Sequence, residues 1–240
     1  MSTKYENEMR EYQRTLAALF PEGAGKGPTS FSKWRQNAQI VRDMLMKRLD
    51  EDNVKRRQID AEFTTNYASA RKAKIDADYA EMCEAGARVI RKGFDAVLAA
   101  KRESFKNAMK APTDEQLRLL TALSMRQNVG GDEISYFAEN LAGNLPALRC
   151  LSEVAGKNKI AFPAILTGSE LEDSLESSSA AMEKYLSTLG VGTDDLKYEH
   201  RLFWCTSGGF RESNTFDTLD SPGFMSAGIG MNGDNKNATS

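Results

Sequence analysis

The sequence predicts an all-α protein in which a long extended helix is followed by a small three-helix module, one or two further helices and a disordered C-terminal tail. Three observations predict this fold class. Between Pro28 and Pro112 there is no proline, and helix-forming residues are abundant. Short apolar segments with helix caps follow. From Thr206 onward, glycine, serine, asparagine and aspartate dominate.

Composition and breaker residues divide the chain into five expected segments. We expect a short helix and Gly/Pro linker over residues 1–29, a long charged helix over 30–111, a three-helix module over 112–160, C-terminal helices over 161–205 and a disordered tail over 206–240. At the α-helical rise, the second segment would extend for about 120 Å. A rod of this length is too long for an ordinary globular domain.

The long helix carries a narrow apolar stripe. From Ile75 to Val97 its members are 4, 3, 4, 4, 4 and 3 residues apart, which gives two repeats of eleven. This period is typical of a straight or slightly right-handed coiled coil. An isolated helix would leave the stripe in water, so we expect the chain to form a homo-oligomer through it. The expected self-association residues are Phe63, Tyr67, Ile75, Tyr79, Ile90, Phe94 and Val97.

Residues 47–60 interrupt the stripe, because nine of the fourteen are charged. One interpretation is a hinge near residues 50–53 at which the rod folds back on itself. The other is a solvated stretch of helix whose opposite charges pair three and four residues apart. The sequence leaves open whether the helix is straight or folded back.

The expected three-helix module begins with a capping box formed by Thr113 and Gln116. Gly130 and Gly131 separate its first two helices, and Asn144 caps the third. We expect Phe137 on its inner face. A second capping box is predicted to start at Ser169 and to open a helix that ends near Gly190.

Catalytic chemistry is not indicated. The chain has a single histidine, and the three cysteines lie far apart, which excludes a disulfide framework and a CxxC metal knuckle. Lys26 is followed by glycine rather than Ser or Thr and has no strand before it, so it does not mark a phosphate-binding loop. We therefore expect no enzyme activity, no cofactor and no metal. Without a signal peptide or an apolar run that could span a bilayer, we expect a cytoplasmic protein with no membrane partner.

Charge is distributed unequally along the chain. Residues 31–110 carry 18 Lys and Arg against 12 Asp and Glu, whereas residues 111–240 carry 10 against 18. Such a split favours either head-to-tail contacts between copies or binding of the basic half to a nucleic acid backbone. The third helix of the module is poor in basic residues, which argues against sequence-specific DNA reading. Any nucleic acid binding is expected to be non-specific.

Two resemblances bear on function. The apolar spacing between Met125 and Leu151 resembles that of ubiquitin-associated-like three-helix domains, which dock proteins. The stretch PTDEQLRLLTALSMRQNVGGDEISYFAENLAGNLPALRCLSEVAGK, after a long charged helix, is similar to segments of uncharacterised bacteriophage and prophage proteins of the head-assembly type. This second resemblance implies a scaffolding-like or minor structural protein, in the host cytoplasm or the virion. Its partner would be a capsid or other virion protein.

We therefore expect a non-catalytic assembly protein that self-associates through the long helix and docks a partner through its C-terminal part. The alternative is a nucleic-acid-associated protein that uses the basic helix. Within the C-terminal part, large aromatic side chains in the expected tail are the predicted docking residues, namely Phe210, Phe216 and Phe224.

Overall fold

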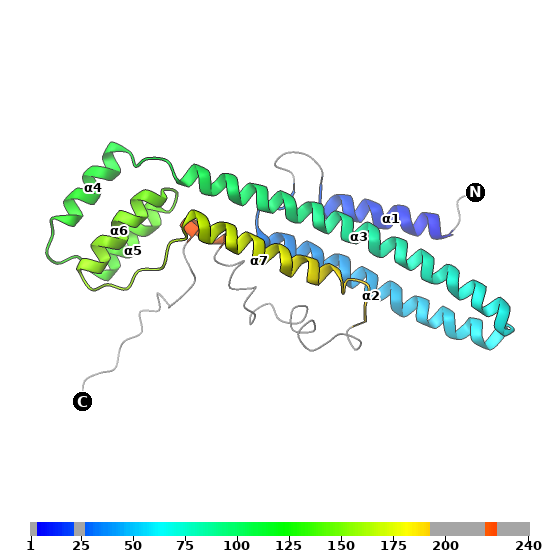
Figure 1. The fold of residues 1–240 in the computed structure, drawn as a ribbon. Coiled ribbons are helices and arrows are strands. Elements are labelled where there is room, and N and C mark those ends of the chain that lie inside the picture. The colour runs from blue at the N-terminus through cyan, green and yellow to red at the C-terminus, as the bar shows by residue number, and fades with distance from the viewer. Residues whose placement is uncertain (1–3, 22–26, 193–218, 225–240) are drawn as a thin grey trace, which may run out of the picture. The chain divides into compact units, whose positions relative to one another are not determined.

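The computed structural model describes residues 4–21, 27–192 and 219–224. The described residues contain no β-strand and one 3₁₀ turn, Pro222–Phe224, so the all-α prediction is confirmed. None of the helices in these ranges has an apolar run long enough to cross a membrane. The helices, shown in Figure 1, are α1 (Lys4–Leu19), α2 (Phe31–Glu62), α3 (Thr65–Ala108), α4 (Asp114–Ser124), α5 (Gly131–Leu141), α6 (Leu145–Lys157) and α7 (Gly168–Leu186).

The chain divides into two compact units, and each unit is built from two separate stretches of sequence. Unit 1 comprises residues 1–100 and 176–213, and unit 2 comprises residues 101–175 and 214–240. The boundaries fall within α3 and α7, so both helices contribute residues to both units.

Helices α2 and α3 form an antiparallel hairpin in unit 1 (Figure 1). Near the start of α2, the indole Nε1 of Trp34 donates a hydrogen bond to the carbonyl of Ile90, 3.0 Å away. Near the end of α2, Arg56 pairs with Asp76, which lies early in α3. A residue later in α2 therefore pairs with a residue earlier in α3, as expected for two antiparallel helices.

The structure thus differs from a single continuous helix over residues 30–111. A long helix is present, but it begins at Thr65, because the chain reverses at Phe63 and Thr64. Phe63 has an extended backbone, and its N–H donates to the carbonyl of Ile59 and closes α2. The N–H of Ala68 donates to the carbonyl of Thr64 at the start of α3. The reversal lets the apolar faces of α2 and α3 cover each other within one chain.

Aromatic side chains form the centre of the unit 1 core. Phe31, Trp34 and Phe94 are each fully buried. The Phe94 ring centroid lies 4.9 Å from that of Trp34, in an edge-on arrangement, and 5.6 Å from that of Phe31. Edge-on packing of this kind adds to the hydrophobic stabilisation of the buried rings. The core continues along α1, α2 and α3 through Tyr12, Leu16, Ala38, Val41, Leu45, Ile90 and Val97.

The charged stretch at residues 47–60 remains helical. Asp52 is fully buried and accepts hydrogen bonds from Arg48 Nε at 2.8 Å and from Lys55 Nζ at 2.7 Å. Arg48 also pairs with Glu8 of α1. No hinge forms at residues 50–53, and the central charge of the stretch is sequestered instead of being solvated. The network links α1 to α2 because Arg48 pairs with Asp52 in its own helix and with Glu8 in α1.

The end of α7 is fixed within unit 1 by a buried cation. Arg42 of α2 is fully buried, and its Nη1 donates to the carbonyls of Thr188 at 3.2 Å and Val191 at 3.4 Å. The hydroxyl of Tyr79 donates to the carbonyl of Gly190 at 3.1 Å. A cation at a helix C-terminus also interacts favourably with the helix dipole.

Unit 2 contains the expected three-helix module. The capping box at the start of α4 is present, with Thr113 and Gln116 each accepting a backbone hydrogen bond from the other. Asn144 caps α6 by accepting from the N–H of Ala147 at 2.9 Å. The module buries one apolar core, made of Leu120, Leu123, Ile134, Ala138, Leu141, Leu145, Leu148, Leu151 and Val154.

Two local predictions in unit 2 need correction. Phe137 is half-buried beside the exposed ring of Tyr136, because the inner face of α5 is formed by Ile134, Ala138 and Leu141. The second capping box lies two residues earlier than predicted. Thr167, not Ser169, is the capping residue of α7, since the Thr167 N–H donates to Glu170 at 2.7 Å and Thr167 Oγ1 accepts from the Glu170 N–H at 3.3 Å.

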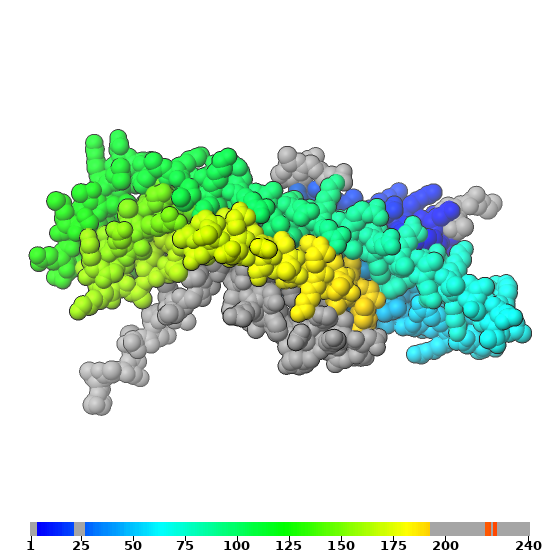
Figure 2. Space-filling model, viewed as in Figure 1, coloured from blue at the N-terminus to red at the C-terminus, as the bar shows by residue number. Residues whose placement is uncertain are grey.

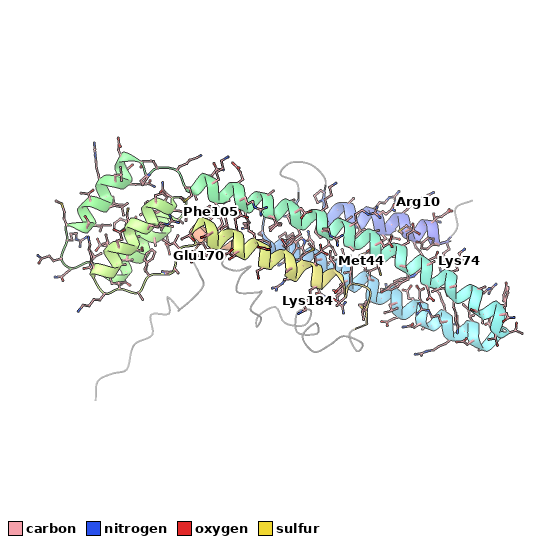
Figure 3. The ribbon with its side chains drawn as sticks, in the orientation of Figure 1. Arg10, Met44, Lys74, Phe105, Glu170 and Lys184 are labelled. Carbon is pink, nitrogen blue, oxygen red and sulfur yellow. The ribbon has the colours of Figure 1, made fainter. Side chains whose placement is uncertain are left out.

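Residues 219–224, expected to belong to the disordered tail, are packed within unit 2. The Phe224 ring centroid lies 5.2 Å from that of Phe105, which is labelled in Figure 3. The Leu166 N–H donates to the carbonyl of Phe224 at 3.2 Å. Lys101 and Asp220 form an ion pair at 2.8 Å with little solvent exposure. The rest of the expected tail lies outside the described residues.

We predict that Phe94→Ala lowers the free energy of unfolding by about 3–5 kcal/mol, because it removes a buried ring and leaves a cavity between Phe31 and Trp34. Urea titration followed by circular dichroism measures this change. The matched control is Tyr136→Ala, which truncates an exposed ring and should alter the unfolding free energy by less than about 1 kcal/mol. Equal effects of the two substitutions would contradict the assignment of Phe94 to the core.

We predict that Gly223→Ala destabilises unit 2. Gly223 has φ of 72°, and a Cβ atom there would lie 2.7 Å from Leu148 Cδ1 and 3.1 Å from the carbonyl oxygen of Ala142. The combined strain and overlap should cost about 1–3 kcal/mol, measured by urea titration. Gly130→Ala is the control, because it has an ordinary φ and open space around it. Unchanged unfolding of Gly223→Ala would show that residues 219–224 do not add stability.

Candidate interaction surfaces

The described residues contain no group of three or more His, Cys, Asp or Glu side chains that could hold a metal ion. Burial raises the pKa of the Cys83 thiol, which opposes formation of a reactive thiolate. His200 and Cys205 lie outside the described ranges.

Most of the predicted self-association stripe is covered by the protein itself. Tyr79, Ile90, Phe94 and Val97 are buried in unit 1, where α3 packs against its neighbouring helices. Ile75 is half-buried. The buried members of the stripe therefore need no second copy to cover them, because the hairpin covers them within one chain. Phe63 at the turn is also half-buried, and Tyr67 is the exposed member of the stripe.

These two aromatic residues and Arg71 form a cluster at the turn of the hairpin, which we call the tip cluster. The ring centroids of Phe63 and Tyr67 are 5.1 Å apart. The guanidinium carbon of Arg71 lies 4.4 Å from the Phe63 centroid and 4.8 Å from the Tyr67 centroid. Tyr67 is 51% exposed. A cation stacked on two rings is a favourable arrangement, and about half of Tyr67 remains exposed to solvent beside it.

Of the three residues in the tip cluster, Phe63 and Tyr67 were among the residues predicted from sequence and Arg71 was not. A usable signal was present, since Phe63, Tyr67 and Arg71 follow one another at intervals of four residues. That spacing places Tyr67 and Arg71 on one face of α3. The turn then brings Phe63 over the same face, which periodicity alone could not show.

Positive charge surrounds the tip cluster. Residues 55–74 include six Lys and Arg and only two acidic residues. On the face shown in Figure 2, the cyan residues around the turn lie at one end of unit 1 with no other segment drawn over them. Lys74, labelled in Figure 3, is exposed on the part of α3 that leads away from the turn.

A second surface feature of unit 1 is an open apolar groove of about 590 Å³ along α1 and α3. Gly93 lies directly under the ring of Phe20, and a Cβ atom at this position would overlap the ring. Arg88 and Lys92 line the groove and are exposed. The apolar wall is made mostly of small side chains together with Leu16 and Phe20, namely Ala17, Ala85, Val89, Ala96, Ala99 and Ala100.

The predicted docking residues of the C-terminal tail are only partly described. Phe210 and Phe216 lie outside the described ranges. Phe224 is buried against Phe105 in unit 2, so it does not present a free aromatic side chain in this conformation. The reason is the 3₁₀ turn at Pro222–Phe224, which directs the ring inward instead of leaving it in an extended tail.

Comparison of the chain with protein family models, with curated proteins and with solved structures gave no match.

Proposed function

We propose that this protein is a non-catalytic assembly or structural protein that works by associating with copies of itself and with a partner. The observation that carries the proposal is the apolar groove of unit 1. The described residues leave it open, and its walls offer small apolar side chains that allow a helix to approach closely. Exposed apolar surface of this kind is typical of a protein interface.

The occupant we propose for the groove is the same groove face of a second copy. Asp95 is exposed and lies seven residues, or two helical turns, beyond Arg88, so both flank the groove on one side of α3. In an antiparallel pair of α3 helices centred between these positions, Arg88 of each copy would face Asp95 of the other. Such self-complementarity is what a two-fold interface requires.

The setting we propose is virion assembly, through a scaffolding-like or minor structural role. It rests on the resemblance of residues 112–157 to segments of uncharacterised bacteriophage and prophage proteins of the head-assembly type. The protein would then be found in the host cytoplasm or the particle. A C-terminal contact with a capsid or other virion protein, through Phe210 and Phe216, belongs to the same proposal. Purified immature and mature particles of the source virus, probed with an antibody to the chain, would test the setting, and absence from both would contradict it.

We predict that Ala96→Arg abolishes self-association, because it places a long charged side chain in the groove. Light scattering coupled to gel filtration, over about a hundred-fold range of concentration, should show association for the wild type and a monomer for the variant. Ala80→Arg is the control, since Ala80 is exposed on the opposite face of the same helix. A monomeric wild type at every concentration would overturn the proposed self-association.

Charge exchange tests the proposed register. Arg88→Asp alone should weaken the dimer through repulsion from Asp95 of the second copy. Arg88→Asp combined with Asp95→Arg should restore it, because the pair is reformed with the charges exchanged. Association of the single variant at the wild-type level would reject this register while leaving other arrangements of the groove open.

A second candidate function is non-specific binding to nucleic acid through the basic hairpin. One observation favours it, the excess of Lys and Arg around the turn. The affinity of the full chain for a nucleic acid, measured at several salt concentrations, distinguishes it from the first candidate.

A further inference from the structure

The tip cluster is not explained by the stability of the hairpin. Phe94, Trp34 and Phe31 already supply a buried aromatic core, whereas Tyr67 is 51% exposed at the turn. Single exposed apolar side chains are common on protein surfaces, so what distinguishes Tyr67 is its fixed position beside Phe63 and Arg71. Arg71 donates a hydrogen bond from Nη2 to the Tyr67 hydroxyl at 3.2 Å, which helps to hold the exposed ring in one orientation.

The basic residues near this ring are of two kinds, those paired with carboxylates and those exposed to solvent. Arg56 and Lys72 pair with Asp76 and Asp60 across the hairpin and help to hold its two helices together. Other cations near the turn are exposed, including Arg57 on α2 and Lys74 on α3. An anionic chain that passes over the tip would therefore meet positive charge on both helices.

A second exposed aromatic pair in the chain shows what is particular to the tip. The rings of Tyr136 and Phe137 on α5 are 5.4 Å apart, and Tyr136 is 62% exposed. Helix α5 carries Asp132, Glu133 and Glu139 and no Lys or Arg. The aromatic geometry is similar in the two places, but only the tip combines it with positive charge.

We propose that the hairpin tip is a binding site for single-stranded nucleic acid. An unpaired base stacks on the exposed face of Tyr67, and the flanking phosphates lie against Arg57 and Lys74. A duplex keeps its bases stacked on each other and so cannot use the ring. This inference rests on the second candidate function and deepens it by naming the form of the nucleic acid and the residues in contact with it.

The test is fluorescence anisotropy of a labelled 20-nucleotide oligo(dT) strand, and of a 20-base-pair duplex, titrated with the full chain. The strand should bind more tightly than the duplex. Tyr67→Ala should weaken strand binding by about 5- to 150-fold, because stacking of one base is lost. Tyr67→Phe should retain the affinity. Arg57→Gln with Lys74→Gln should reduce the slope of log affinity against log salt by about 1.4, as expected when two phosphate contacts to a single strand are removed.

Tyr136→Ala is the matched control and should leave strand binding unchanged. Duplex binding equal to strand binding, with no effect of Tyr67→Ala, would overturn the inference and leave the second candidate function standing. No binding to either form at low salt would overturn both. Displacement of the strand by polyglutamate as efficient as that by unlabelled oligo(dT) would also overturn the inference, because charge alone would then account for binding. Circular dichroism of each variant confirms that the helices are intact.

Discussion

The contact between Phe94 of α3 and the rings of Phe31 and Trp34 on α2 is the interaction on which the rest of unit 1 depends. It closes the hairpin at the end far from the turn, while Lys72 and Asp60 close it near the turn. Because the apolar faces of α2 and α3 pack against each other, those faces are not available to bind a partner. The surface of unit 1 that remains available consists of the turn itself and of the side of α3 that borders α1.

Local chemistry explains which features could be predicted from sequence. The first capping box, the cap on α6 and the absence of proline depend on residues close together in the chain, so the helices of unit 2 and the end of α3 were predicted, with the second capping box placed two residues late. The reversal at Phe63 was not located, because two helices separated by a two-residue turn have nearly the same composition as one. Its physical basis is the pairing of residues such as Trp34 and Ile90, which are 56 positions apart. No pattern among neighbouring residues of the sequence predicts such a contact.

The candidate surfaces show the same limit. Phe63 and Tyr67 were identified from periodicity, but so were Ile90, Phe94 and Val97, which are buried. An apolar stripe on a helix shows which residues are expected to be buried. It does not show whether they are buried by another chain or by the same one. The groove was not predicted from sequence because alanines are common in any helix. They form the wall of a groove only when α1 packs beside α3. Phe224 was assigned to a free tail because the turn around Gly223 requires contacts with α6 that lie far away in sequence.

The discontinuity of both units has a consequence for biosynthesis. Unit 1 needs the end of α7 to satisfy Arg42, and unit 2 needs residues 219–224 to complete the packing around Phe105. During translation the first hundred residues therefore leave the ribosome without a finished core, and neither unit can close until most of the chain has been made. Nascent chains of proteins with this topology expose apolar surface for longer than chains whose domains fold one after another. Ribosome-associated chaperones would thus have a longer interval in which to engage this polypeptide.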